Sequence, residues 1–166
     1  IDEEGNLNYI SGRIDPANEA WESARKSLLT EFIFKGESVY VIGNHWNSKR
    51  GDTAVFGMDQ PPVQGSRDQR EEIAEVVHDF IAELKDRQPE ANVVVLGDFN
   101  DFPWSPPLQI LEGEGMLYNA IYELQRNEQF TYVYNGNSQS LDSIVVSSHL
   151  QEGLKADIMH INSQFM

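Results

Sequence analysis

Hydrophobic and polar residues alternate in short runs near the start of the chain. Residues 27–34 read SLLTEFIF and residues 39–43 read VYVIG, with the turn-forming sequence KGES between them. Alternation of this kind favours β-strands, and a short polar turn joins strands that run antiparallel. The pattern therefore predicts a β-hairpin over residues 27–43.

Apolar residues recur every three or four positions through residues 67–86. Side chains at this spacing fall on one face of a helix, which can then pack against a sheet. We expect Ser66 to cap the start of this helix, and Pro89 follows its expected end. Between the hairpin and the helix, residues 45–66 form a polar segment with several glycines and prolines, which predicts a long loop that is either functional or mobile. The apolar positions of the helix are Ile73, Val76, Val77, Phe80, Ile81 and Leu84.

The second half of the chain begins with the apolar run 93–96, which predicts a buried strand that ends in the acidic turn GDFND. Short helices are expected near residues 107–111 and 117–124. A second hairpin is expected from residues 130–134 and 141–146, joined by the turn NGNS, and a last strand is expected at ADIMHIN, residues 156–162. Strand pairs beside a long amphipathic helix predict an α/β fold, with one mixed or antiparallel sheet that carries helices on one face.

Composition narrows the possible functions. The chain has 166 residues, a length typical of one domain, and no apolar run that approaches the roughly 20 residues needed to cross a membrane. The absence of cysteine excludes disulfides, thiolate metal sites and a cysteine nucleophile. The net charge of −15 disfavours unspecific binding of nucleic acid. A phosphodiesterase remains compatible with this charge, because bound cations invert the local field.

Three predicted strand ends carry polar side chains that suit chemistry. Asn44 and His45 follow the first apolar strand pair, Asp98 and Asn100 follow the buried strand, and Asp142 precedes another apolar run. Turns favour Asp and Asn for backbone reasons alone, so each strand end by itself is also compatible with a purely structural turn. Together, an imidazole, carboxylates and an amide suit a site for a hard cation such as Mg²⁺, Mn²⁺ or Ca²⁺.

Other common catalytic motifs are missing from the sequence. No HExxH or GxSxG is present, which removes the usual zinc-protease and serine-hydrolase patterns. Neither GxxxxGK[ST] nor GxGxxG occurs, so nucleotide-binding folds have no motif to support them.

Seven segments, in this order, resemble the endonuclease/exonuclease/phosphatase superfamily, the fold of pancreatic-type deoxyribonuclease. Within it, the chain is most similar to bacterial proteins described as predicted extracellular nucleases, which implies an extracellular or periplasmic location. The resemblance implies a four-layer αββα sandwich and metal-dependent phosphodiester hydrolysis, with nucleic acid or another phosphodiester as substrate. The segments are GRIDPANEAWESARKSLLTEF, GNHWNSKRGD, FGMDQPP, SRDQR, VVLGDFNDFPWS, YVYNGNSQSLDSIVVS and MHIN.

The resemblance also implies roles for individual residues. His45 matches the histidine that contacts the scissile phosphate and helps to protonate or stabilise it. Asp98 matches the carboxylate that orients or deprotonates the attacking water, and Asn100 matches an amide that contacts phosphate or metal. Arg25 resembles an arginine that approaches the phosphate, and Asp142 matches a carboxylate that supports the site. Asp98 and Asn100 are thus the expected ligands of a divalent metal, Mg²⁺ or else Mn²⁺ or Ca²⁺.

Further residues near these positions are candidates for substrate binding: Asn44, Trp46 and Lys49. Asn44 has the alternative role of a strand-end hydrogen bonder. Trp46 and Trp104 fit either a substrate groove or edge packing, and Asp101 is expected to be a turn residue behind the site.

The chain also departs from the family pattern. The family's metal-binding glutamate on an early strand and its closing Asp-His segment have no counterpart here, and Ser143 stands where close relatives commonly carry His. We therefore expect residues 1–166 to form a single partial domain, the C-terminal portion of a catalytic domain. Such a half would leave the apolar inner face of its sheet uncovered and prone to self-association. The alternatives to a nuclease are a catalytically incomplete binding module and a phosphoesterase acting on lipids or small phosphodiesters.

Overall fold

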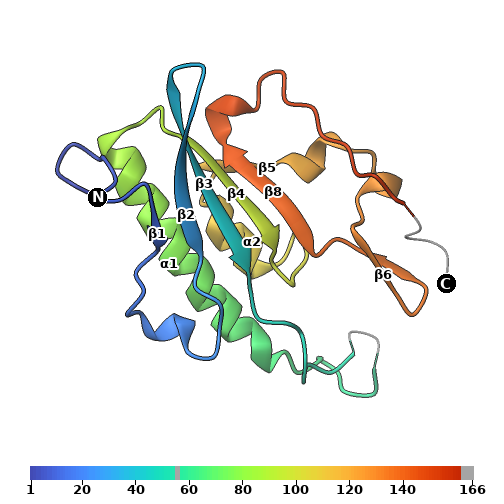
Figure 1. Cartoon of the computed structure of the whole chain (residues 1–166). Coiled ribbons are helices and arrows are strands. Elements are labelled where there is room, and N and C mark those ends of the chain that lie inside the picture. Colours follow the sequence, from blue (N-terminus) through green and yellow to red (C-terminus); the bar gives the residue numbers. More distant parts are fainter. Residues whose placement is uncertain (55–56, 162–166) are drawn as a thin grey trace.

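A six-stranded mixed sheet forms the centre of the molecule, as the computed structural model of residues 1–54 and 57–161 shows (Figure 1). The strand order is β1-β2-β3-β4-β8-β5, and every neighbouring pair is antiparallel except β3 and β4. The strands of this sheet are β1 (Ser11–Arg13), β2 (Leu28–Phe34), β3 (Glu37–His45), β4 (Asn92–Asp98), β5 (Leu117–Asn119) and β8 (Asp142–Ser147).

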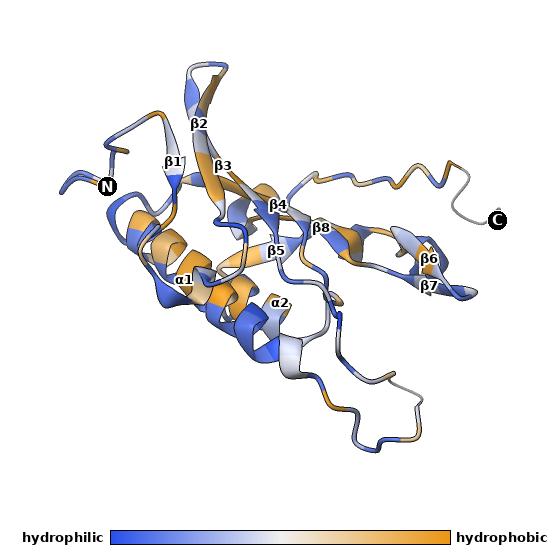
Figure 2. Ribbon diagram, turned by 60° about the horizontal axis from the view of Figure 1, so that its bottom comes forward, coloured by the Kyte–Doolittle hydropathy of each residue, from blue (hydrophilic) through white to orange (hydrophobic). Residues whose placement is uncertain are grey.

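Two α-helices, α1 (Gly65–Arg87) and α2 (Pro106–Glu112), lie on the same side of this sheet (Figure 2). The chain runs from β3 through α1 to β4, because parallel neighbours need a long crossover connection. Most of the predicted apolar stripe of α1 is fully buried, and it joins Ile42, Val93 and Val95 of the sheet in one core. The predicted α/β class, a mixed sheet with helices on one face, is confirmed.

Several local predictions hold in detail. The hairpin over residues 27–43 is β2 paired with β3, and the helix near residues 107–111 is α2. The long loop lies between β3 and α1, although its residues 55–56 are outside the described part of the chain.

The expected cap of α1 is wrong. The helix starts at Gly65, with Gln64 at the capping position, so Ser66 lies inside the first turn. The backbone N–H and the hydroxyl of Ser66 both donate to the carboxylate of Asp52, at 3.0 and 2.6 Å. A side chain from the preceding loop therefore satisfies an N-terminal amide of the helix, which a residue at the start of the helix would ordinarily do.

The predictions for the last third of the chain need correction. Residues 117–124 form β5 and the 3-10 helix η2 (Ala120–Glu123) in place of one α-helix. The second hairpin pairs β6 (Tyr132–Tyr134) with β7 (Asn137–Gln139), whereas β8 inserts between β4 and β5 in the main sheet. The expected strand at residues 156–162 is not formed over residues 156–161, and Asn162 lies outside the described residues.

The other described helices are 3-10 turns: η1 (Glu19–Trp21), η3 (Arg126–Glu128) and η4 (Ser148–Leu150). Among the residues that the structure describes, none of the helices combines the length and the apolar character that a membrane span requires.

Neither α-helix covers the second face of the sheet, here called the open face (Figure 2). Side chains alternate between the two faces along each strand, and the open face receives those of Leu28, Phe32 and Phe34 from β2 and Ile144 from β8. All four are exposed. The described residues thus form two layers, one of helices and one of sheet, with apolar side chains on the outer side of the sheet.

Candidate active site

Three of the predicted catalytic side chains lie in one row across neighbouring strands. His45 ends β3, Asp98 ends β4, and Asp142 begins β8. In the sheet, His45 is the register partner of Asp98, which is in turn the register partner of Asp142. Directly opposite residues project to the same face, so these side chains form a row, here called the strand-end row, at the rim of the open face. His45 Nε2 lies 3.8 Å from Asp98 Oδ2.

The glycine of GDFND allows this close arrangement. Gly97 has a φ of 134°, and a Cβ atom at this position would lie 2.1 Å from the carbonyl oxygen of Asn44 on β3. A side chain would therefore push β4 away from β3 just before Asp98. Glycine at this position keeps the carboxylate of Asp98 beside the imidazole of His45.

The turn after β4 is held by its own polar groups. Asp98 Oδ1 accepts a hydrogen bond of 2.8 Å from the backbone N–H of Asn100, which adopts a positive φ of 51°. Asparagine tolerates this conformation better than most residues. The side-chain amide of Asn100 donates to the carbonyl of Trp46 at 3.0 Å, and no described residue donates to its Oδ1. Asp98 Oδ2 and Asn100 Oδ1 are consequently left available to a ligand.

Asp101, the next residue of the turn, is buried in a salt-bridge network. Its carboxylate accepts hydrogen bonds from Arg70 Nε at 2.8 Å, from Lys49 Nζ at 2.6 Å and from the backbone N–H of Phe102 at 3.0 Å. Because its oxygens already bind the side chains of Arg70 and Lys49, Asp101 stabilises the turn and does not face the site, as the sequence suggested. Sequence reasoning missed Arg70, which is fully buried in α1.

Arg70 also joins α1 to the loop that follows β3. Its Nη1 donates to the hydroxyl of Ser66 at 2.6 Å and to the carbonyl of Asn47 at 3.2 Å, and its Nη2 lies 3.7 Å from Asp52 Oδ2. Burial raises the pKa of Asp52, but the hydrogen bonds from Ser66 and the charge of Arg70 outweigh it and leave this pKa below its usual value. Burial lowers the pKa of Lys49, and the bond to Asp101 only partly offsets this effect.

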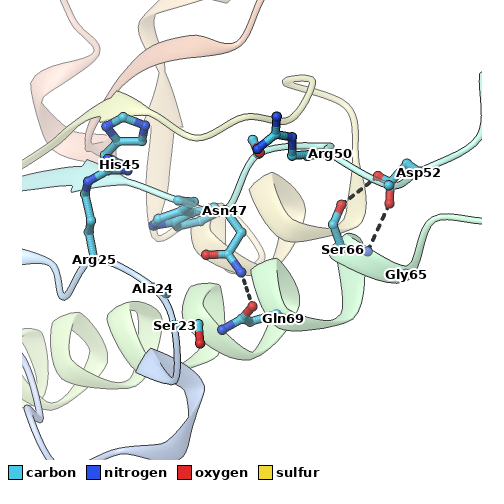
Figure 3. Close-up of a pocket in the computed structure, with 13 residues that line it drawn as sticks. Ser23, Ala24, Arg25, His45, Asn47, Arg50, Asp52, Gly65, Ser66 and Gln69 are labelled. Atoms are coloured by element: carbon cyan, nitrogen blue, oxygen red, sulfur yellow. Dashed lines mark hydrogen bonds between the residues drawn. The ribbon is translucent and has the colours of Figure 1, made fainter.

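A polar pocket of about 960 Å³ begins at His45 and extends to the first turn of α1 (Figure 3). Arg25 and Arg50 both line it, and neither forms an ion pair within residues 1–54 and 57–161. Figure 3 shows the side chain of Arg25 directed toward His45. In a chain of net charge −15, two unpaired guanidinium groups in one pocket favour an anionic ligand.

The structure brings some predicted residues to the site and gives others different contacts. His45, Asp98, Asp142 and Asn100 come together, and Arg25 shares the pocket with His45. The three residues predicted to bind substrate all form contacts with other side chains of the protein.

The side chain of Asn44 accepts hydrogen bonds from Ser27 Oγ and Trp46 Nε1, at 2.5 and 3.1 Å, which agrees with the alternative role of a strand-end hydrogen bonder. Trp46 lines the pocket with almost no exposed surface, because its ring is buried and packs edge-on against Phe99 at 4.8 Å. Lys49 is bonded to Asp101, as described above. Contact of these three side chains with substrate stays a prediction.

The available oxygens fit a divalent metal only in part. Within residues 1–54 and 57–161, no three His, Cys, Asp or Glu side chains lie close enough together to hold a metal ion. Mg²⁺, however, usually keeps several waters and is held by one or two carboxylates together with substrate phosphates. Asp98 and Asn100, with Asp142 on the next strand, offer oxygens of this kind.

Comparison with known proteins finds several solved structures with a similar fold. Solved structures similar to the chain include the catalytic domain of human Nocturnin with bound sulfate (16% identity, TM-score 0.59, covering 84% of this chain and 47% of that one). Another is truncated TDP2 from Caenorhabditis elegans (16% identity, TM-score 0.55, covering 82% and 50%). The chain thus spans about half the length of these structures, and their likeness concerns the fold.

Comparison with curated proteins finds no match. The sequence model of the Endonuclease/Exonuclease/phosphatase family matches residues 8–165, which is nearly the whole chain. The protein therefore belongs to the endonuclease/exonuclease/phosphatase family.

Proposed function

We propose that the protein contributes the strand-end row to the active site of a metal-dependent phosphodiesterase, and that its substrate is nucleic acid. The observation that carries this proposal is the row of His45, Asp98 and Asp142 beside a pocket with two unpaired arginines. Membership of the family supports phosphodiester hydrolysis in general.

Each side chain has a role that its position permits. Asp98, with Oδ2 left available, orients the attacking water and accepts its proton. His45 contacts the phosphate and stabilises the charge that develops on its oxygens, while Arg25 neutralises the phosphate from the pocket side. Asp142, on the neighbouring strand, supports Asp98 from the other side of the row. Asp98 and Asn100 would hold the divalent metal, which supplies Lewis-acid polarisation of a phosphate oxygen when bound.

The open face indicates where the rest of such a site would lie. The strand-end row stands at the rim of this face, so a second layer packed on it would bring further side chains to His45 and Asp98. We propose that residues 1–166 are one half of a four-layer sandwich whose second sheet covers the open face. The apolar side chains there and the half-length match to the solved structures support this proposal.

A hydrolysis assay tests the proposed reaction. The complete parent protein, and residues 1–166 alone, are incubated with plasmid DNA, a single-stranded oligonucleotide, phospholipid vesicles and a small phosphodiester, in Mg²⁺, Mn²⁺ or Ca²⁺ and in EDTA. We expect the complete protein to cleave DNA in a reaction that EDTA abolishes, and residues 1–166 alone to show very weak cleavage or none. Loss of a metal ligand or a general base costs about 10²–10⁴-fold in rate. Hydrolysis of the lipid or the small phosphodiester alone would favour the alternative substrate class. Binding of these substrates by the complete protein with no hydrolysis in any metal would favour a catalytically incomplete binding module and contradict the proposed reaction.

Without a second layer, the open face is expected to drive self-association of the chain at tens of micromolar. Burial of apolar surface contributes about 25 cal/mol per Å² to the free energy of association, and the entropy lost on association offsets part of this gain. We expect Phe32→Ser to shift the mass measured by light scattering toward the monomer. Ile33→Ser is the matched control, because Ile33 is an exposed neighbour that projects to the opposite face. A monomer in the unmodified chain, or equal effects of both substitutions, would contradict this prediction.

A further inference from the structure

An exposed tryptophan follows the turn that carries Asp98 and Asn100. Trp104 is 68% exposed, whereas the other tryptophans of the chain, Trp21 and Trp46, are 3% and 1% exposed. Tryptophan is usually well buried, so a single exposed one beside a candidate active site calls for a reason. The segment with Trp104 leads from β4 into α2, which packs against α1 on the covered side of the sheet. A second layer packed on the open face would therefore not explain why Trp104 is exposed.

The indole ring is stacked on a second aromatic ring. Trp104 and Phe102 have ring centroids 5.0 Å apart and planes that differ by 10°. The ammonium group of Lys49 lies over the ring of Phe102, 4.8 Å from its centroid, while it also bonds Asp101. Because the ring of Trp104 is stacked on one face and is still largely exposed, its other face is open to a ligand.

Hydrogen bonds to backbone carbonyl groups fix the turn that presents this ring. The N–H and the hydroxyl of Ser105 both donate to the carbonyl of Phe102, at 2.9 and 2.7 Å. The hydroxyl of Tyr122 donates to the carbonyl of Pro103 at 3.0 Å. An aromatic side chain held in place before binding loses little conformational freedom when a ligand stacks on it. The pair of Phe102 and Trp104 is here called the aromatic platform.

The platform lies within a short span of the strand-end row. Trp104 lies six positions after Asp98 in the sequence, a stretch that reaches at most about 20 Å when fully extended. The turn described above shortens this distance. A nucleic acid strand with its scissile phosphate at His45 and Asp98 would thus place a neighbouring base within reach of the indole ring.

We infer that Trp104 binds a nucleobase by stacking, next to the phosphodiester that is cleaved. This inference rests on the proposed phosphodiesterase function and names its substrate class as nucleic acid with unpaired bases. Bases inside a duplex are already stacked on their neighbours, whereas an unpaired base has a free face for an aromatic side chain. Stacking of this kind is tolerant of sequence, because every base presents a π-face.

Binding of two oligonucleotides tests the inference. A fluorescein-labelled oligothymidylate and an abasic oligonucleotide of the same length are titrated with protein in the Asp98→Asn background, which prevents cleavage, and anisotropy is recorded. We expect Trp104→Ala to weaken binding of the oligothymidylate by roughly fivefold to 100-fold and to leave binding of the abasic strand unchanged. Trp104→Phe should retain most of the affinity, since it keeps an aromatic ring.

Tyr9→Ala is the matched control, because Tyr9 is an exposed aromatic residue that precedes β1 and belongs to neither the strand-end row nor the aromatic platform. It should leave binding of both strands unchanged. Equal effects of Trp104→Ala on both strands, or no effect on either, would overturn the inference. The hydrolysis assay stays independent of this outcome: if it detects DNA cleavage while Trp104→Ala binds normally, only the base-stacking role fails. If it detects no phosphodiester cleavage in any metal, the proposed function fails whatever the binding result.

Discussion

In the complete parent protein, replacing Asp98 with alanine is expected to abolish phosphodiester hydrolysis and to leave the fold intact. Asp98 ends β4 and is 34% exposed, whereas the packing of this strand is carried by the buried Val93 and Val95. A group that activates water acts mainly in the transition state, so the loss should appear in kcat, by about 10²–10⁴-fold. Steady-state kinetics on the cleaved substrate and a thermal melt of the variant measure the two effects.

His149→Ala serves as the internal control for this experiment. His149 is exposed, belongs to η4 beyond the end of β8, and contacts Asn92 at the opposite end of β4 from Asp98. Its replacement should change neither kcat nor the melting temperature appreciably. Near-normal turnover by Asp98→Ala would show that the turn GDFND has a structural role and takes no part in the reaction.

Replacing Arg70 with methionine is expected to destabilise the protein by about 3–5 kcal/mol. Arg70 is fully buried, and its guanidinium lies beside the carboxylates of Asp101 and Asp52. Removal of one partner from a buried ion pair leaves a charge without compensation, which costs far more than the loss of a surface pair. Urea denaturation followed by circular dichroism measures the free energy of unfolding.

Arg67→Met is the matched control in the same helix. Arg67 forms an i,i+4 pair with Glu71 at 3.1 Å, and both side chains are partly exposed. Pairs of this type contribute about 0.3–0.5 kcal/mol. Adding Asp101→Asn to Arg70→Met should restore part of the lost stability, because it removes one of the stranded charges. Similar losses for Arg67→Met and Arg70→Met would contradict the importance of the buried network.

The elements with strong local patterns were the ones that the sequence predicted well. The β2–β3 hairpin and α1 have regular periodicity over many residues. The helical spacing of Leu117, Ile121 and Leu124 favours a helix over residues 117–124, but here a strand followed by a 3-10 turn has the same spacing. The partner of β8 was also missed. Strand pairing depends on contacts between distant parts of the chain, about which local alternation carries no information.

The sequence indicated which residues belong to the candidate site better than it indicated how they are arranged. Polar residues at strand ends and the resemblance to the family indicated His45, Asp98 and Asp142, but the register that aligns them was visible only in the structure. The sequence did contain a signal for the role of Arg70. Arg70 precedes Ile73 and Val77 by three and seven positions, which places it on the apolar side of α1. A cation that is buried there must be paired.

The parallel pairing of β3 with β4 ties the chemistry of this protein to the order in which it folds. His45 and Asp98 meet only after residues 46–91 have crossed over and α1 has docked on the sheet. Contacts between residues so distant in sequence require a long loop to close first, which costs conformational entropy. A newly made chain in which this crossover has not closed would hold the histidine and the carboxylate apart. The pair would thus assemble only together with the crossover, which keeps chains that lack it free of the pair.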